Sequence, residues 1–285
     1  MDKLELLHLK FLKWSLGVHK KASNTGCYGD TGRVALACGL LPQGLKYFFR
    51  VAAISGDGNN TLVGKAYAEQ KDCNLTWYRT WNQISSQSAV ISGNSSSLTV
   101  NYKLLEDKFL INWKVNLLTQ SKLSFYRQLK DIHDYEPYLD NINFQQRKHI
   151  SRLRVSAHDL NVEIGRYNQE RRGRLAAKAC RFCCDGEILA GFEQLPFFED
   201  PVLETEEHAL SACPEYSVIR KSLSKDLQLL LEIKDYNNIN ESHAKELGKF
   251  LSDCFLHRHP EKKNPGGKCR RSVHQTDNSQ HRKGL

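Results

Sequence analysis

The stretch that decides the fold reads Cys180-Arg-Phe-Cys183, then 24 residues from 184 to 207, then His208-Ala-Leu-Ser-Ala-Cys213, directly followed by Pro214. The C-x-x-C and H-x-x-x-x-C spacings allow a short turn to direct both side chains of each pair to one ion. Three thiolates and one imidazole complete a tetrahedral set, which is typical of structural zinc and leaves no position for a substrate. The sequence therefore predicts a Cys3His zinc site that staples this segment.

Other interpretations of these cysteines stay open. Cysteine is often a buried apolar residue, and the 24-residue interval exceeds compact zinc-finger spacings, so the pairs could be unrelated core thiols. Cys184 could also replace Cys183 as a ligand, although the C-x-x-C spacing favours Cys183. A disulfide is disfavoured in a chain without an export signal. Charged residues near the pairs favour a metal site over a core: Arg171, Arg172, Arg174, Lys178, Arg181, Glu204, Glu206 and Glu207.

The composition is that of a basic protein with enough apolar residues for a core. The chain has 285 residues, of which 40% are hydrophobic, so one to two domains are expected. The mean hydropathy is -0.54, the formal net charge is +9 and the pI is near 9.0. This balance favours a polyanionic partner over a pocket for an acidic substrate.

The cysteine count and the absence of targeting signals indicate a reducing compartment. Nine cysteines are an odd number, unevenly spread, which suits reduced thiols and a metal cluster better than a set of disulfides. The first residues do not form a secretory signal, and no run of 18 apolar residues occurs, so neither secretion nor a membrane partner is expected. The nucleus or the cytoplasm is the predicted location.

Hydrophobic periodicity predicts a mainly α fold, an irregular multi-helix assembly. Leu4, Leu7, Phe11 and Trp14 indicate an amphipathic helix over 2–14 that Gly17 ends. In the apolar segment 34–54, Pro42 and Gly44 predict a break or a kink that divides it into two helices. Further helices are expected at 62–73, around Trp77 and Trp81, and at 104–118, 216–233 and 242–255, the last capped by Ser242. Residues 150–160 fit either a short strand or the start of a helix.

The predicted parts of the chain follow from these elements. They are a helical region (1–84), a flexible break (85–97), a helical basic region (98–179), the zinc segment (180–220), C-terminal helices (221–256) and a disordered basic tail (257–285).

Most of the excess positive charge leads into the first cysteine pair. Residues 147–181 hold ten Lys or Arg against three acids, a net charge of +7. Such a run is expected to contact the phosphates of RNA or DNA, although a solvated helix face would look similar. Tyr167 and Phe182 could stack on bases or cover the metal. The predicted phosphate contacts are Arg152, Arg154, Arg166, Arg171, Arg172 and Arg174.

Several motifs together resemble the C-terminal region of the reverse transcriptase polyprotein of a non-LTR (LINE-type) retrotransposon, downstream of the polymerase palm. They span about residues 8 to 255 in the expected order: Phe11-Leu12-Lys13, Leu16-Gly17-Val18, Tyr28-Gly29-Asp30-Thr31-Gly32-Arg33, Tyr126, Lys130, Glu136-Pro137-Tyr138-Leu139, Leu153-Arg154-Val155-Ser156-Ala157-His158, Glu163-Ile164-Gly165-Arg166-Tyr167, Cys180-x-x-Cys183, Glu204, Glu207-His208-x-Leu210, Cys213-Pro214-x-Tyr216 and Arg220. The chain departs from the family at Asp30, where Glu is usual, at 34–36, where a proline-containing stretch is usual, and in the length of its 184–207 interval.

The resemblance implies an RNA-directed DNA polymerase whose catalytic aspartates would precede residue 1, and the chain has no Asp-Asp dipeptide. Nucleotidyl transfer needs paired carboxylates for its two metal ions, so no catalytic residue is predicted in this part. The resemblance also implies a second nucleic-acid contact near the polymerase thumb, formed by Lys20, Lys21 and Arg33, although a plain solvent loop explains these residues equally well. The expected function is non-catalytic nucleic-acid binding. The alternatives are a part of an active polymerase when joined to a palm domain, a protein-interaction scaffold, and a degenerate element.

Overall fold

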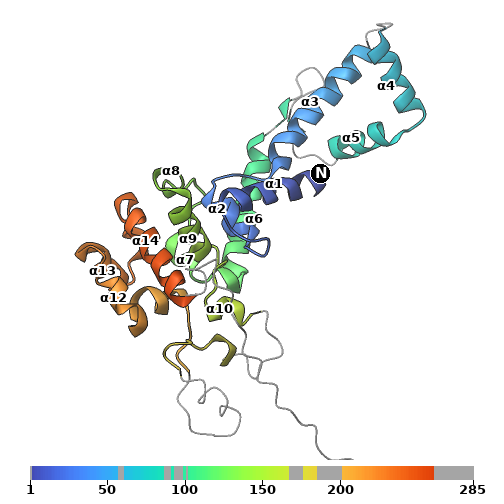
Figure 1. Ribbon diagram of the computed structural model, residues 1–285. Helices are drawn as coiled ribbons and strands as arrows, with labels where there is room; N and C mark the ends of the chain where they lie inside the picture. The colour runs from blue at the N-terminus through green and yellow to red at the C-terminus, as the bar shows by residue number, and fades with distance from the viewer. Residues whose placement is uncertain are drawn as a thin grey trace, which may run out of the picture.

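The computed structural model describes residues 2–56, 61–86, 91–92, 99–100, 102–166, 176–184 and 201–259. The fold is mainly helical, as the sequence predicts (Figure 1). The N-terminal half contains α1 (Asp2–Ser15), α2 (Asn24–Asp30), α3 (Leu36–Gly56), α4 (Leu62–Asp72), α5 (Thr76–Ser86), β1 (Ile91–Ser92), β2 (Thr99–Val100) and α6 (Tyr102–Thr119). No described helix is long and apolar enough to span a bilayer.

The C-terminal half is built from shorter elements. They are η1 (Ser121–Leu123), α7 (Tyr126–Leu129), α8 (Tyr138–Asn141), α9 (Phe144–Arg154), α10 (Asn161–Ile164), η2 (Ala176–Lys178), the π-helical turn η3 (His208–Ala212), η4 (Pro214–Tyr216), α12 (Ser217–Arg220), α13 (Lys225–Glu232), η5 (Tyr236–Asn238) and α14 (Glu241–Arg258). Residues 150–160, which the sequence left undecided, complete α9 and the turn after it.

Helix α3 corrects a prediction. The break expected at Pro42 and Gly44 does not occur, and the helix runs unbroken from Leu36 to Gly56. Pro42 costs about 3 kcal/mol in a helix interior, and packing of α3 against α4, α5 and α6 outweighs that cost. Gly44 allows α3 and α5 to approach closely, because a Cβ atom at this position would lie 2.0 Å from the ring of Trp81. The glycine therefore lets α5 pack directly on α3.

Helices α3, α4 and α5 form an arm that projects from the rest of the molecule (Figure 1). The ring of Phe48, 3% exposed, lies at the centre of its own aromatic cluster. Its centroid is 5.6 Å from that of Trp77 and 6.0 Å from those of Tyr67 and Tyr78. In the predicted flexible break, Ser85 and Ser86 belong to α5 and Ile91–Ser92 pairs antiparallel with Thr99–Val100. The rest of that break lies outside the described residues.

The main core lies between the first helices and the C-terminal ones. Leu12 of α1 and Leu16, directly after that helix, share one buried cluster with Leu153 of α9 and Phe250 of α14. Helix α14 packs along α9 and continues to Arg258, so the first residues of the predicted tail are helical. Its N-cap is Asn240, whose side chain accepts from the backbone N–H of His243, and not Ser242 as predicted. Residues 260–285 lie outside the described residues.

Candidate metal centre

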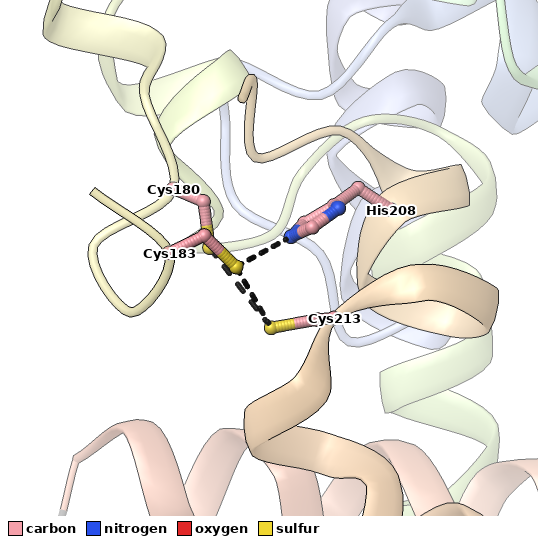
Figure 2. Close-up of side chains that lie close together, drawn as sticks. All are labelled: Cys180, Cys183, His208 and Cys213. Carbon is pink, nitrogen blue, oxygen red and sulfur yellow. Dashed lines mark hydrogen bonds between the residues drawn. The ribbon is translucent and has the colours of Figure 1, made fainter. Parts of the chain in front are cut away.

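Cys180, Cys183, His208 and Cys213 come together as the sequence predicts (Figure 2). Their ligand atoms all lie within 4.8 Å of one another. The Sγ atom of Cys213 is 4.0 Å from that of Cys180 and 3.9 Å from that of Cys183, and the Cys183 sulfur is 3.4 Å from Nε2 of His208. Zn–S bonds of about 2.3 Å at tetrahedral angles place two sulfurs about 3.8 Å apart. The group can therefore hold one tetrahedral metal ion.

The first ligand pair is positioned by backbone pairing with the segment before His208. Ala179 forms an antiparallel bridge with Leu203. The N–H of Cys180 donates to the carbonyl of Val202 at 2.7 Å, and the N–H of Glu204 donates to that of Lys178 at 2.8 Å. This pairing lies next to the metal ligands in both segments, so it fixes the distance between the C-x-x-C turn and the second pair.

The second ligand pair lies at the two ends of a π-helical turn. The N–H of Cys213 donates to the carbonyl of His208 at 2.7 Å, which brings the i and i+5 residues close together. The guanidinium of Arg220 donates to the carbonyls of Leu210 and Cys213 at 2.7 and 3.1 Å and so satisfies carbonyls at the end of the turn. Pro214, which has no N–H to donate, starts the next element.

Side-chain placement bears on two residues near the ligands, Cys184 and Phe182. The sulfur of Cys184 approaches the carbonyl of Val202 at 3.8 Å and is not part of the ligand group. The ring of Phe182 packs edge-on against that of Tyr216 at 5.6 Å and lies 5.9 Å from that of His257. Phe182 is therefore partly buried against these two rings, next to the ligand Cys183. Tyr167 lies outside the described residues.

The electrostatics of the group suit a cation. Burial raises the pKa of Cys180, but hydrogen bonds from His208 and from backbone N–H groups outweigh it and lower that pKa to about 7. Burial and the neighbouring Cys180 thiol raise the pKa of Cys183 to about 12. Burial and the same neighbour also raise the pKa of Cys213. Ionisation of one thiol thus makes ionisation of the neighbouring thiols less favourable. A divalent ion would offset this repulsion and stabilise all three thiolates.

A buried ion pair, which the sequence did not reveal, anchors the metal segment to α14. Glu204 and Arg258 form a hydrogen-bonded ion pair, with side chains 1% and 2% exposed. Glu204 also accepts from the N–H of Asn161 at 2.8 Å, and Arg258 donates to the Asn161 side chain at 3.0 Å. Glu204 belongs to the retrotransposon-like motifs, whereas Arg258 falls in the segment predicted to be a disordered tail. No local pattern links residues 54 positions apart.

A second buried carboxylate ties the same segment to the turn after α9. Glu206 accepts from the hydroxyl of Ser156 at 3.0 Å, and its carboxylate lies 2.9 Å from Nε2 of His158. Although burial acts in the opposite direction, the hydrogen bond and charge of His158 lower the pKa of Glu206. The segment between the ligand pairs is therefore fastened to both α14 and the α9–α10 turn.

The predicted nucleic-acid contacts fall in different places. Four of them come together beside α1 and η1: Lys20, Lys21, Arg152 and Arg166. Arg154 instead donates to the fully buried Asp30 and to Glu136, so its charge is used inside the protein. Arg33 follows α2 at the end opposite to Lys20 and Lys21 and lies near Tyr135. Arg171, Arg172 and Arg174 lie outside the described residues.

The fold and the site define a helical protein with a Cys3His group suited to a structural metal ion. No protein-family profile matches the chain, and no curated protein or solved structure shows significant similarity to it.

Proposed function

We propose that this chain binds nucleic acid, without catalysis, through a cationic surface that a structural zinc site holds in place. The observation that carries the proposal is the convergence of cations from five segments around residues 17–21. This basic surface consists of Lys13, Lys20, Lys21, Lys122, Lys148, Arg152 and Arg166.

Contacts to backbone carbonyls fix several of these cations without cancelling their charge. Lys13 Nζ donates to the carbonyl of Lys20 at 2.8 Å, and Lys122 Nζ donates to that of Lys21 at 2.9 Å. Arg152 Nε donates to the carbonyl of Gly17 at 3.1 Å. These carbonyl contacts leave the charges of Lys13 and Arg152 uncancelled, whereas Lys122 also forms an ion pair with Glu163.

Two histidines lie close enough to these cations for their pKa values to respond to them, although burial is the larger cause and nearby carboxylates act in the opposite direction. Burial, followed by the charges of Lys122 and Arg152, lowers the pKa of His19. Burial, followed by the charges of Arg152 and Lys148, lowers the pKa of His149 to about 4. Glu163 pairs with Lys122 and Arg166, and Asp159 lies near Arg152, but the cations outnumber these carboxylates. Such a surface supports electrostatic attraction of phosphates.

The metal centre and the basic surface share their supports. Glu206, two residues before the ligand His208, holds Ser156, whose hydroxyl also donates to the carbonyl of Lys122 at 2.6 Å. Asn161 donates to the carbonyl of Ala179 at 2.7 Å, directly before the ligand Cys180. Zinc bound by the four ligands would hold the two turns together, so we infer that it orients Lys122 and the cations around it.

The resemblance to LINE-type reverse transcriptases agrees with a binding role for this part. Among the residues that the structure describes, the Cys3His group is the only cluster of three or more groups suited to a metal. Zinc in such a closed set is structural. We therefore propose that any RNA-directed DNA polymerase activity depends on a separate domain that supplies the paired carboxylates.

The metal part of the proposal is tested by metal analysis of matched cysteine variants. The wild-type protein and Cys184→Ser are expected to carry about one zinc per chain, because Cys184 faces the Val202 carbonyl. Cys183→Ser and Cys213→Ser remove a ligand and are expected to lose stoichiometric zinc. Equal zinc content in all four proteins would rule out the site.

The binding part is tested by the salt dependence of affinity for a fluorescent single-stranded RNA and for a DNA duplex. Replacing Lys20, Lys21 and Lys148 by Gln should lower the slope of log K against log salt by up to about 2–3, since each lost phosphate contact contributes about 0.7–0.9. The matched control replaces Lys65, Lys71 and Arg79, exposed residues of the arm, and removes the same charge. An equal loss in both triple variants would mean that net charge alone drives binding and would contradict a defined surface.

A further inference from the structure

Helix α1 exposes an apolar stripe along its whole length. Leu4 is 51% exposed, Leu7 63%, Phe11 58% and Trp14 74%. Leu12, on another side of the same helix, is buried with 3% exposure. Isolated exposed apolar side chains are ordinary, but a contiguous row of four large ones marks an interaction surface.

The stripe has the spacing of a helix–helix seam. Leu4, Leu7, Phe11 and Trp14 follow one another at steps of three, four and three residues, which are the a and d positions of a heptad. Lys3 and Lys10, both exposed, then occupy the g positions beside the seam. The described acid of this helix, Glu5, lies on the other side, where it accepts from the hydroxyl of Tyr28. The seam is therefore bordered by positive charge.

This charge pattern does not suit a second copy of α1. In an antiparallel pair, g positions face g positions, so Lys3 and Lys10 would meet the same lysines of the other copy. In a parallel pair, g positions face e positions, which are His8 and Ser15 and supply no carboxylate. Like charges across a helix pair are unfavourable, so the seam favours a different helix with acidic flanks.

We propose that the exposed stripe of α1 docks one amphipathic helix of a partner protein, with Leu-like residues in its seam and Glu or Asp at the positions that face Lys3 and Lys10. The contact would extend over the 14 residues of α1, about 21 Å. Trp14, a large and rigid side chain, would be its main anchor. This surface is separate in chemistry from the basic surface, because its core is apolar and its ligand is a peptide.

The experiment uses the full chain and a labelled synthetic helical peptide of three heptads, with Leu at a and d and Glu at e and g. Fluorescence anisotropy is expected to show saturable binding to the wild-type protein. Leu7→Ser/Phe11→Ser removes the centre of the seam and should abolish binding, with an unchanged circular dichroism spectrum because both side chains are exposed. Lys3→Glu/Lys10→Glu should bind about tenfold more weakly at low salt, and should gain affinity for the same peptide with Lys at e and g.

The matched control is Lys65→Glu/Lys71→Glu on the exposed face of α4, which should bind the peptide like the wild type. The proposal is overturned if the peptide does not bind or if the seam variant binds it equally well. It is also overturned if the stripe instead inserts into phosphatidylserine vesicles, or if sedimentation shows a dimer that Leu7→Ser/Phe11→Ser dissociates. Loss of nucleic-acid binding alone, with peptide binding intact, would count against the proposed function and not against this surface.

Discussion

At the scale of single residues, Asp30 is a fully enclosed charge with several partners. Its carboxylate is 0% exposed, pairs with Arg154 at 2.9 Å, and accepts from the hydroxyls of Tyr126 and Tyr138 at 3.0 and 2.9 Å. Burial and the Asp30 charge raise the pKa of both tyrosines well above its usual value. Burial opposes the charge of Arg154, but Asp30 and Glu136 raise its pKa. These partners join α2 to α7, α8 and α9.

We expect Asp30→Ala to destabilise the protein by about 3–5 kcal/mol, because the mutation leaves the Arg154 guanidinium without its main counter-charge. The free energy of unfolding in urea measures this loss. Asp72→Ala on the exposed end of α4 is the matched control and should cost less than about 0.5 kcal/mol. The double variant Asp30→Ala/Arg154→Met should recover part of the stability. A loss below about 1 kcal/mol for Asp30→Ala would contradict the role of this ion pair.

How far the sequence predicts a residue's role depends on where its partners lie. Cys180 and Cys183, like His208 and Cys213, are local pairs, so their spacing alone identified the group that the structure brings together. Arg154 lies in a run of basic residues, so the local sequence predicts a surface contact for it. Its partner Asp30 lies 124 positions away and could not be identified from that run. Sequence patterns report short-range geometry, and an ion pair between distant segments has no such pattern.

At the scale of elements, the helices with a periodic apolar pattern could be predicted from the sequence. The helices that differ from prediction do so because of tertiary contacts. The amphipathic patterns predicted α1, α6 and α14 with boundaries close to the observed ones. The continuity of α3 through Pro42 could not be predicted, because it depends on α4, α5 and α6 packing around it. The extension of α14 to Arg258 depends in the same way on a buried partner, Glu204.

The Glu204–Arg258 pair leads to an element-level prediction for the metal centre. Arg258→Ala leaves Glu204 buried without its counter-charge and should cost about 3–5 kcal/mol. Because Glu204 lies in the segment that pairs with Lys178, two residues before Cys180, zinc should also dissociate more readily. Competition with a fluorescent chelator measures that affinity. Lys249→Ala, on the exposed face of the same helix, is the control. Equal zinc affinity in both variants would contradict a coupling between the Glu204–Arg258 ion pair and the metal centre.

At the scale of the whole molecule, the arm, the central helices and the C-terminal helices follow one another along one direction (Figure 1). Glu206 and Asn161 connect the metal centre to the basic surface, which combines Lys13, Lys20 and Lys21 from the N-terminal segments with cations of η1, α9 and the turn after α10. The aromatic cluster of the arm is separate from the main core. A change at the metal centre should therefore affect the basic surface and leave the arm intact.

Metal removal tests this division. A chelator is expected to lower the melting temperature of the main core and to weaken RNA affinity, because zinc holds the supports of Lys122 and its neighbours. Adding zinc back should restore both. Hydrogen exchange of amides in α3 and α4 should stay the same throughout. If the metal-free protein kept its stability and its affinity, zinc would have no role in orienting the basic surface.

The contact between Gly44 and Trp81 allows tryptophan fluorescence to report on the packing of α5. The chain has four: Trp14 is on the surface of α1, Trp113 is 4% exposed in the core, and Trp77 and Trp81 belong to the arm. A methyl group at position 44 would overlap the Trp81 indole, so Gly44→Ala should displace that ring into water. The resulting red shift in emission would report detachment of α5 from α3 within the arm.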